Sequence, residues 1–145
     1  MAERADADTF TLRVLTPMGE ALNMDASALR VPAWDGQLGV LARHAPMIAL
    51  LRIGSSVVTG PDGRRRWLAT VGGVLRVKRD EVVMLVDAAE EADEIDVERA
   101  HRALARAQQR LATRADDTDI ARAEMALARA ANRLRVAESA GARTI

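Results

Sequence analysis

Short runs of alternating apolar and polar residues dominate the chain up to about residue 89. Phe10, Leu12 and Val14 alternate with polar neighbours, and Pro17 and Gly19 close this run. Alternation with a period of two is typical of half-buried strands. Regularly spaced short strands of this kind predict a β-sandwich or flattened barrel. Seven further runs have the same character: SALRVP, QLGVLA, MIALLRIG, SSVVTG, RRWLATVGG, VLRVK and EVVMLVDA.

The pattern changes after residue 89, where glycine and proline are absent until Gly141 and alanine, leucine and arginine dominate. This composition predicts helix. Asp96 and Asp119 are placed to cap two helices, and the polar stretch ATRADDT between them predicts a turn. The sequence therefore predicts an α+β protein with a β-sandwich domain over residues 1–91 and an α-helical hairpin over residues 92–145.

The two predicted helices repeat one pattern. DVERAHRALARAQQRL (96–111) and DIARAEMALARAANRL (119–134) agree at ten of sixteen positions. Apolar residues spaced by three and four in both helices predict an antiparallel hairpin. Its alanine-rich seam buries little apolar area, so we expect the hairpin to detach or rearrange readily. The seam residues are Val97, Ala100, Leu104, Ala107 and Leu111, with Ile120, Ala123, Leu127, Ala130 and Leu134.

An arginine stripe follows each helix, and equivalent stripes of an antiparallel pair emerge on one side. Such a face is either solvated or binds anions. Four of its arginines have no acidic residue three or four positions away, so local ion pairs do not neutralise them. Guanidinium groups suit a bound nucleotide or an acidic protein partner. The stripes are Arg99, Arg106 and Arg110, and Arg122, Arg129 and Arg133; Arg106, Arg110, Arg129 and Arg133 are the four.

Composition argues against several classes of function. The chain has no cysteine, which excludes disulfides and thiolate metal sites. Its formal net charge is zero, so we expect no nucleic-acid partner. The two histidines, His44 and His101, fall in different predicted halves, so we expect neither a catalytic nor a metal site. No apolar run approaches the ~18 residues of a membrane span, so we expect no direct membrane insertion.

Several motifs in order resemble the epsilon subunits of bacterial rotary (F-type) ATP synthases over nearly the whole chain. DGQLGVLARHAPMIALL resembles the family's glycine pair and His-x-Pro turn, VGGVLRV its double-glycine strand, and IDVERA the opening of its helical hairpin. One departure is LARH, because the family commonly has a glycine before the histidine.

The resemblance implies a ten-stranded flattened sandwich followed by a two-helix antiparallel hairpin. It also implies a non-catalytic central-stalk subunit that couples rotation to ATP synthesis and restrains ATP hydrolysis through its hairpin. The implied partners are the gamma subunit, the c-ring and the catalytic alpha/beta head, at the cytoplasmic face of the bacterial cell membrane.

Some members of that family bind regulatory ATP on the hairpin, and the resemblance leaves open whether magnesium accompanies it. A separate set, Asp35, Gln37 and His44, is implied to contact the ring or stalk. The positions implied for ATP are Glu90, Ile95, Asp96, Arg99, Ala100, Arg106, Arg129 and Arg133.

Two alternatives remain open at the level of the sequence. One is a free-standing nucleotide- or anion-sensing adaptor, and the other is an RNA-binding arginine hairpin. Copurification with a multisubunit ATPase and the salt dependence of binding distinguish these classes.

Overall fold

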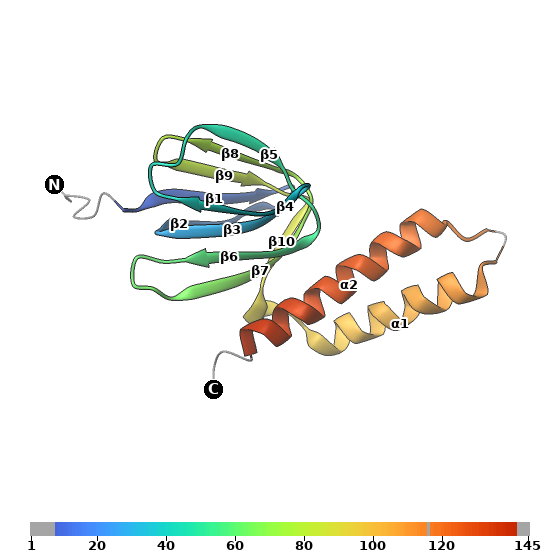
Figure 1. The fold of residues 1–145 in the computed structure, drawn as a ribbon. Coiled ribbons are helices and arrows are strands. Elements are labelled where there is room, and N and C mark those ends of the chain that lie inside the picture. Colours follow the sequence, from blue (N-terminus) through green and yellow to red (C-terminus); the bar gives the residue numbers. More distant parts are fainter. Residues whose placement is uncertain (1–7, 116, 142–145) are drawn as a thin grey trace. The chain divides into compact units, whose positions relative to one another are not determined.

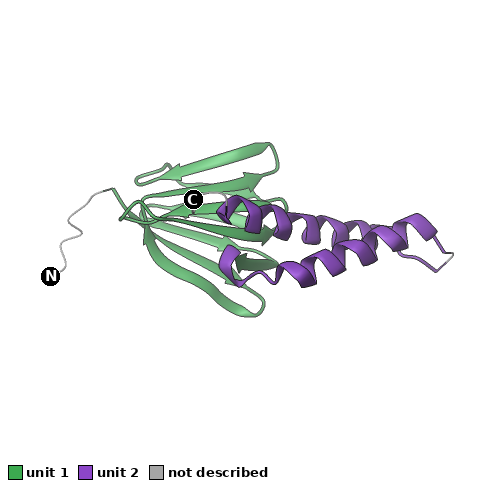
Figure 2. Cartoon of the chain, turned by 90° about the horizontal axis from the view of Figure 1, so that it is seen from below, with its two compact units in different colours: residues 1–91 green, residues 92–145 purple. Residues whose placement is uncertain are grey.

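The computed structural model describes residues 8–115 and 117–141. The chain divides into two compact units, residues 1–91 and 92–145, coloured green and purple in Figure 2.

The first unit is a β-sandwich of ten strands in two five-stranded sheets (Figure 1). Sheet A has the order β2-β1-β9-β8-β5 and sheet B the order β10-β7-β6-β3-β4. Neighbouring strands are antiparallel except for the parallel pair β1 and β9. The predicted ten-stranded sandwich is confirmed. The strands are β1 (Phe10–Thr16), β2 (Gly19–Ala26), β3 (Ala28–Ala33), β4 (Gly36–Leu41), β5 (Met47–Leu50), β6 (Gly54–Thr59), β7 (Arg65–Val71), β8 (Val74–Lys78), β9 (Glu81–Leu85) and β10 (Ala88–Glu91).

Alternate residues of the strands build one core between the sheets. Phe10, Leu12 and Val14 of β1 are fully buried, as their alternation predicted. Leu29 and Val31, which alternate along β3, are likewise buried on the inner face of sheet B. Large and branched aliphatic side chains therefore supply most of the core.

The alternation pattern alone missed two strands and extended a third beyond its end. β2 buries only Leu22 and Ala26, and β10 is four residues long without a β-branched residue, so neither has a strong strand signal. The run MIALLRIG predicted one strand. Instead, β5 ends at Leu50, and Leu51 forms an isolated bridge with Ala33 as the chain crosses from sheet A to sheet B.

The second unit contains a short 3-10 turn η1 (Ala92–Glu94) and two helices, α1 (Val97–Thr113) and α2 (Ile120–Gly141). The predicted caps are confirmed, because the Asp96 carboxylate accepts from the Arg99 backbone N–H and that of Asp119 from the Arg122 N–H, both at 3.0 Å. Arg114 ends α1 in the left-handed conformation (φ 42°). Neither of the described helices is long and apolar enough to cross a membrane.

The helices pack along the predicted small-residue seam. Ala100, Ala107, Ala123 and Ala130 are buried, and the seam leucines are half-buried. The prediction was wrong for Val97 and Ile120, which are 42% and 39% exposed. Each is the first residue of its helix, and helical side chains lean toward the N-terminus, past the end of the seam.

Candidate functional site

One end of the sandwich gathers three tight turns, which join β1 to β2, β3 to β4, and β7 to β8. The backbone N–H of Trp34, after β3, donates to the Leu50 carbonyl at 3.1 Å, which joins the β3–β4 turn to the end of β5. Leu50 pairs with Val74 at the start of β8. We call this end of the sandwich the turn end.

Exposed apolar side chains cross sheet A at the turn end. Leu15 pairs with Leu85, Leu85 with Val74, and Val74 with Leu50, so these residues form one row over four strands. Their chain neighbours point inward, which places this apolar row on the outer face. Leu50 and Leu85 are 59% and 52% exposed.

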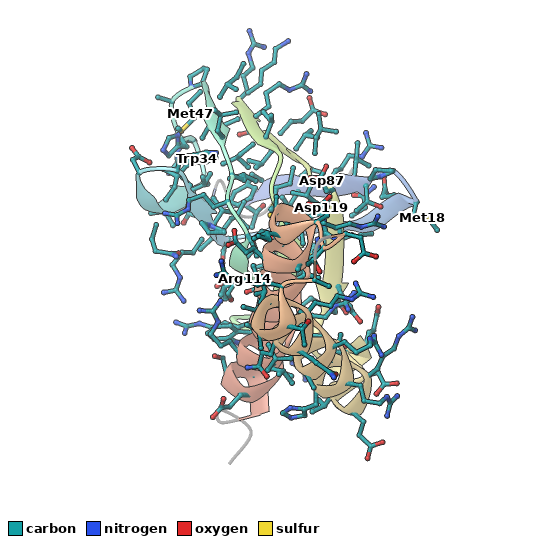
Figure 3. All side chains as sticks on the ribbon, turned by 90° about the vertical axis from the view of Figure 1, so that its right-hand side faces the viewer. Met18, Trp34, Met47, Asp87, Arg114 and Asp119 are labelled. Carbon is teal, nitrogen blue, oxygen red and sulfur yellow. The ribbon has the colours of Figure 1, made fainter. Side chains whose placement is uncertain are left out.

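Two further apolar residues lie at the turn end. Met18, in the β1–β2 turn, is 97% exposed, and Trp34 is 66% exposed; Figure 3 labels both. The backbone N–H of Met18 donates to the Thr16 hydroxyl at 3.1 Å, which fixes the β1–β2 turn. Exposed apolar side chains gathered at one end of a domain are candidates for contact with a binding partner. The sequence did not reveal it, because only strand register brings the row together.

The structure does not bring the three predicted ring or stalk residues together. Asp35 and Gln37 lie at the turn end, whereas His44 follows β4. β4 is extended over six residues and places His44 on the order of 20 Å away from Asp35. Asp35 and Gln37 therefore lie apart from His44, and contact of this set with the ring or stalk stays a prediction.

His44 belongs to a turn at the far end of β4. Its backbone N–H donates to the Leu41 carbonyl at 3.3 Å, and its ring Nδ1 lies 2.7 Å from the Ala45 carbonyl oxygen. Arg43 before it has φ 59°, a left-handed conformation that favours glycine. The loop therefore keeps the backbone shape that a glycine would give, although an arginine occupies the position.

The eight residues predicted to bind ATP have different environments. Glu90 lies in β10 and pairs with Ala69 of β7. Ile95 and Ala100 are buried, so their side chains contribute packing. Asp96 is engaged as the cap of α1.

The four arginines of this set lie on the two helices. Arg99, Arg106 and Arg129 are exposed, and Arg133 is half-buried. Arg106 lies eight residues before Arg114, and Arg129 lies ten after Asp119, so their levels along the hairpin differ by about 3 Å at ~1.5 Å per residue. Arg106 and Arg129 thus lie at similar levels along the two antiparallel helices.

Arg110 and Arg122 meet where the helices join. They line a hollow of ≈ 420 Å³ together with Asp117, Thr118 and Asp119. Here one arginine of each stripe, although not at equivalent positions of the repeat, lines the same hollow. Two carboxylates accompany them, so this end of the face is less favourable to an anion than the sequence indicated.

The first unit carries an exposed apolar row, and the second carries two arginine stripes. These surfaces are typical of a subunit that acts by binding partners. A sequence model described as "ATP synthase, Delta/Epsilon chain, beta-sandwich domain" matches residues 9–92, and one described as "ATP synthase, Delta/Epsilon chain, long alpha-helix domain" matches residues 93–138. The chain belongs to the family of ATP synthase epsilon chains.

Relatives and solved structures agree with this assignment. The epsilon chain of Carboxydothermus hydrogenoformans is 46% identical over 108 residues, which are 74% of this chain and 80% of the relative. That of Bacillus subtilis is 46% identical over 103 residues, covering 71% and 77%. A chain of the Euglena gracilis mitochondrial ATP synthase shares the fold with a TM-score of 0.65 at 22% identity, covering 94% of this chain and 82% of the other.

Proposed function

We propose that this chain is a non-catalytic subunit of the central stalk of a proton-translocating ATP synthase, held at the cytoplasmic face of the cell membrane by its partners. The observation that carries the proposal is the apolar row Leu15, Leu85, Val74 and Leu50. An apolar surface flanked by Met18 and Trp34 offers the desolvated anchors that protein interfaces use. The row binds the gamma subunit.

A charge placed in the apolar row tests this docking surface. Leu85→Asp should abolish copurification with the multisubunit ATPase, because an unpaired carboxylate would be buried at the interface. Leu41→Asp is the matched control, since Leu41 is equally exposed (64%) but lies on sheet B. Copurification of the Leu85→Asp variant at parental yield would refute the assignment of this surface.

Asp35 and Gln37 at the turn end contact the c-ring in this proposal. Because the chain has no cysteine, single cysteines report positions without background. A crosslinker at Gln37→Cys should reach the ring, and the same crosslinker at His44→Cys should not. Ring products from His44→Cys alone would reverse the orientation of the sandwich.

The hairpin binds ATP as a regulatory ligand and restrains ATP hydrolysis when it extends toward the alpha/beta head. Arg106 and Arg129 lie at similar heights on the folded hairpin, where both can contact the phosphates. An extended hairpin separates the helices and loses this cluster. ATP therefore favours the folded form, since a ligand shifts an equilibrium by its differential affinity.

Calorimetry with ATP, with and without magnesium, tests the nucleotide site. Arg106→Ala and Arg129→Ala each remove a charge-assisted contact of roughly 1.5–3 kcal/mol and should weaken binding by more than about tenfold. Arg135→Ala is the control, because Arg135 is exposed and lies about 240° around α2 from Arg129. If the parent chain and the three variants bind ATP with equal affinity, the nucleotide site is refuted, and the arginines instead contact an acidic protein surface.

Two alternatives remain distinguishable. A free-standing nucleotide-sensing adaptor would bind ATP without copurifying with the ATPase. An RNA-binding hairpin would show a steep loss of RNA affinity with salt.

A further inference from the structure

A second surface hollow lies on the outer face of sheet B, entirely within the first unit. Arg30 of β3 is at its centre, paired with Gly39 of β4 on one side and Val57 of β6 on the other. Gly39 has no side chain, and a Cβ built there would meet nothing within 4 Å. Beside Arg30, the short Ala28 separates Leu41 from Thr59. The result is a hollow of ≈ 420 Å³.

Every polar side chain that lines this hollow carries a hydrogen-bond donor. Arg30, Arg65, Thr59 and Gln37 contribute two guanidinium groups, a hydroxyl and an amide, and the lining contains no carboxylate. Thr59 pairs across the strands with Arg65, which brings the second guanidinium to the same face. Two positive charges and no negative charge favour an anion at this position.

Arg64 and Arg66, on either side of Arg65 in the β6–β7 hairpin, are already engaged in ion pairs. This distinguishes them from the arginines that line the hollow. Arg64 lies 3.6 Å from the Asp62 carboxylate, and Arg66 lies 3.2 Å from that of Glu91. Within residues 8–115 and 117–141, no ion pair is recorded for Arg30 or Arg65. The guanidinium groups of the hollow therefore keep their donors available for a ligand.

We propose that this hollow binds a phosphate-bearing ligand, with Arg30 and Arg65 on the phosphate oxygens. Guanidinium forks match phosphate oxygens in geometry and charge. Val57 and the exposed Leu41 line the remainder of the hollow and contact an apolar part of the ligand. Two sources offer this chemistry: a soluble phosphate compound and the headgroup of an anionic phospholipid. The proposal is independent of ATP binding by the hairpin.

Nuclear magnetic resonance of the ¹⁵N-labelled full chain tests the site. Titration with inorganic phosphate should shift the backbone amide signals of Arg30, Gly39 and Thr59, while signals of α1 and α2 stay in place. Arg30→Ala should weaken this binding by about tenfold, as expected for loss of one charge-assisted contact. Arg76→Ala, on the exposed face of sheet A, is the matched control and should leave it unchanged.

Two further arms decide what the hollow recognises. Gly39→Leu fills the hollow but keeps both arginines, so it should abolish binding if shape matters as well as charge. Vesicles of phosphatidylglycerol should broaden the same amide signals if the source is a lipid, and phosphatidylcholine vesicles should not. If only soluble phosphate acts, the source is a soluble compound. The proposal is overturned if none of the probes affects these amides, or if Arg30→Ala and Gly39→Leu bind like the parent chain.

Discussion

The sandwich and the hairpin bury different kinds of side chain. Phe10, Leu12 and Leu75 of the sandwich are fully buried, and each large side chain contributes roughly 1.5–3 kcal/mol when removed from water. The buried seam of the hairpin consists of alanines such as Ala107 and Ala130, each of which buries a single methyl group. The first unit is therefore suited to be a fixed platform, and the second to rearrange at low cost.

Local interactions consequently matter more in the hairpin than in the sandwich. Isolated helices are marginal in water, and an alanine seam adds little to them. The caps at Asp96 and Asp119 thus supply a large share of the hairpin's stability, whereas the sandwich is stabilised by side chains from strands distant in sequence.

The largest expected difference concerns truncations of buried side chains. Phe10→Ala should lower the free energy of unfolding of the sandwich by about 3–5 kcal/mol, because it leaves a cavity in a rigid core. Leu104→Ala, at a half-buried seam position, should cost the hairpin less than about 2 kcal/mol. Amide hydrogen exchange measures the two units separately. Equal losses in both units from either variant would contradict their independence.

A glycine substitution should show how tightly the sandwich backbone is packed. Gly73 has φ +104°, and an added Cβ would lie 1.9 Å from the Leu85 carbonyl oxygen. Gly73→Ala should cost more than about 3 kcal/mol, because backbone atoms must move. Gly39→Ala and, in α2, Gly141→Ala have open space and should change stability by less than about 1 kcal/mol. The midpoints of denaturant unfolding measure these changes in stability. A Gly73→Ala variant nearly as stable as the parent chain would contradict the close approach of Gly73 to the backbone of Leu85.

Removal of one helix cap should affect the hairpin selectively. Asp96→Ala or Asp119→Ala should cost about 1 kcal/mol of helix stability and lower the helical circular dichroism signal. Asp119→Ser should restore the signal, since serine also accepts the hydrogen bond from the Arg122 N–H. Asp117→Ala, in the same turn, is the control. A loss of sandwich signals in the cap variants would show that the units do not unfold separately.

A smaller gain is expected where a sandwich loop is strained. Arg43→Gly should raise stability by about 0.5–1 kcal/mol, because Arg43 adopts a left-handed conformation. The ion pair that it loses, with Asp8 at 3.1 Å, is exposed on both sides and contributes little. Thermal unfolding measures the change, and a decrease in midpoint would show that this ion pair outweighs the backbone strain.

The smallest effect concerns one surface carboxylate of sheet A. Hydrogen bonds from Arg13, at 2.8 and 3.1 Å, and then from Asn23 lower the pKa of Glu20. A lowered pKa in the folded state stabilises the protein above the ordinary pKa of glutamate, and this contribution disappears as the pH falls through the folded value. Arg13→Ala should raise the pKa of Glu20 in an NMR titration. An unchanged pKa would assign the shift to Asn23.

Much of the architecture could be predicted from local sequence. The alternation of Phe10, Leu12 and Val14, the capping positions Asp96 and Asp119, and the alanine positions of the seams were correct, because they depend on residues a few positions apart. β2 and β10 were missed by alternation, because their stability comes from pairing with strong neighbours rather than from their own composition.

The sequence by itself determined which face of each strand and helix is apolar, since periodicity is a local property of the chain. Only the tertiary structure decided which faces become neighbours. β1 pairs in parallel with β9, about seventy residues away, and this register joins Leu15 to Leu85 in the apolar row. Pairing of β3 with β4 on one side and with β6 on the other forms the hollow around Arg30. Strand register is set by packing of the whole core, so no local pattern encodes these surfaces.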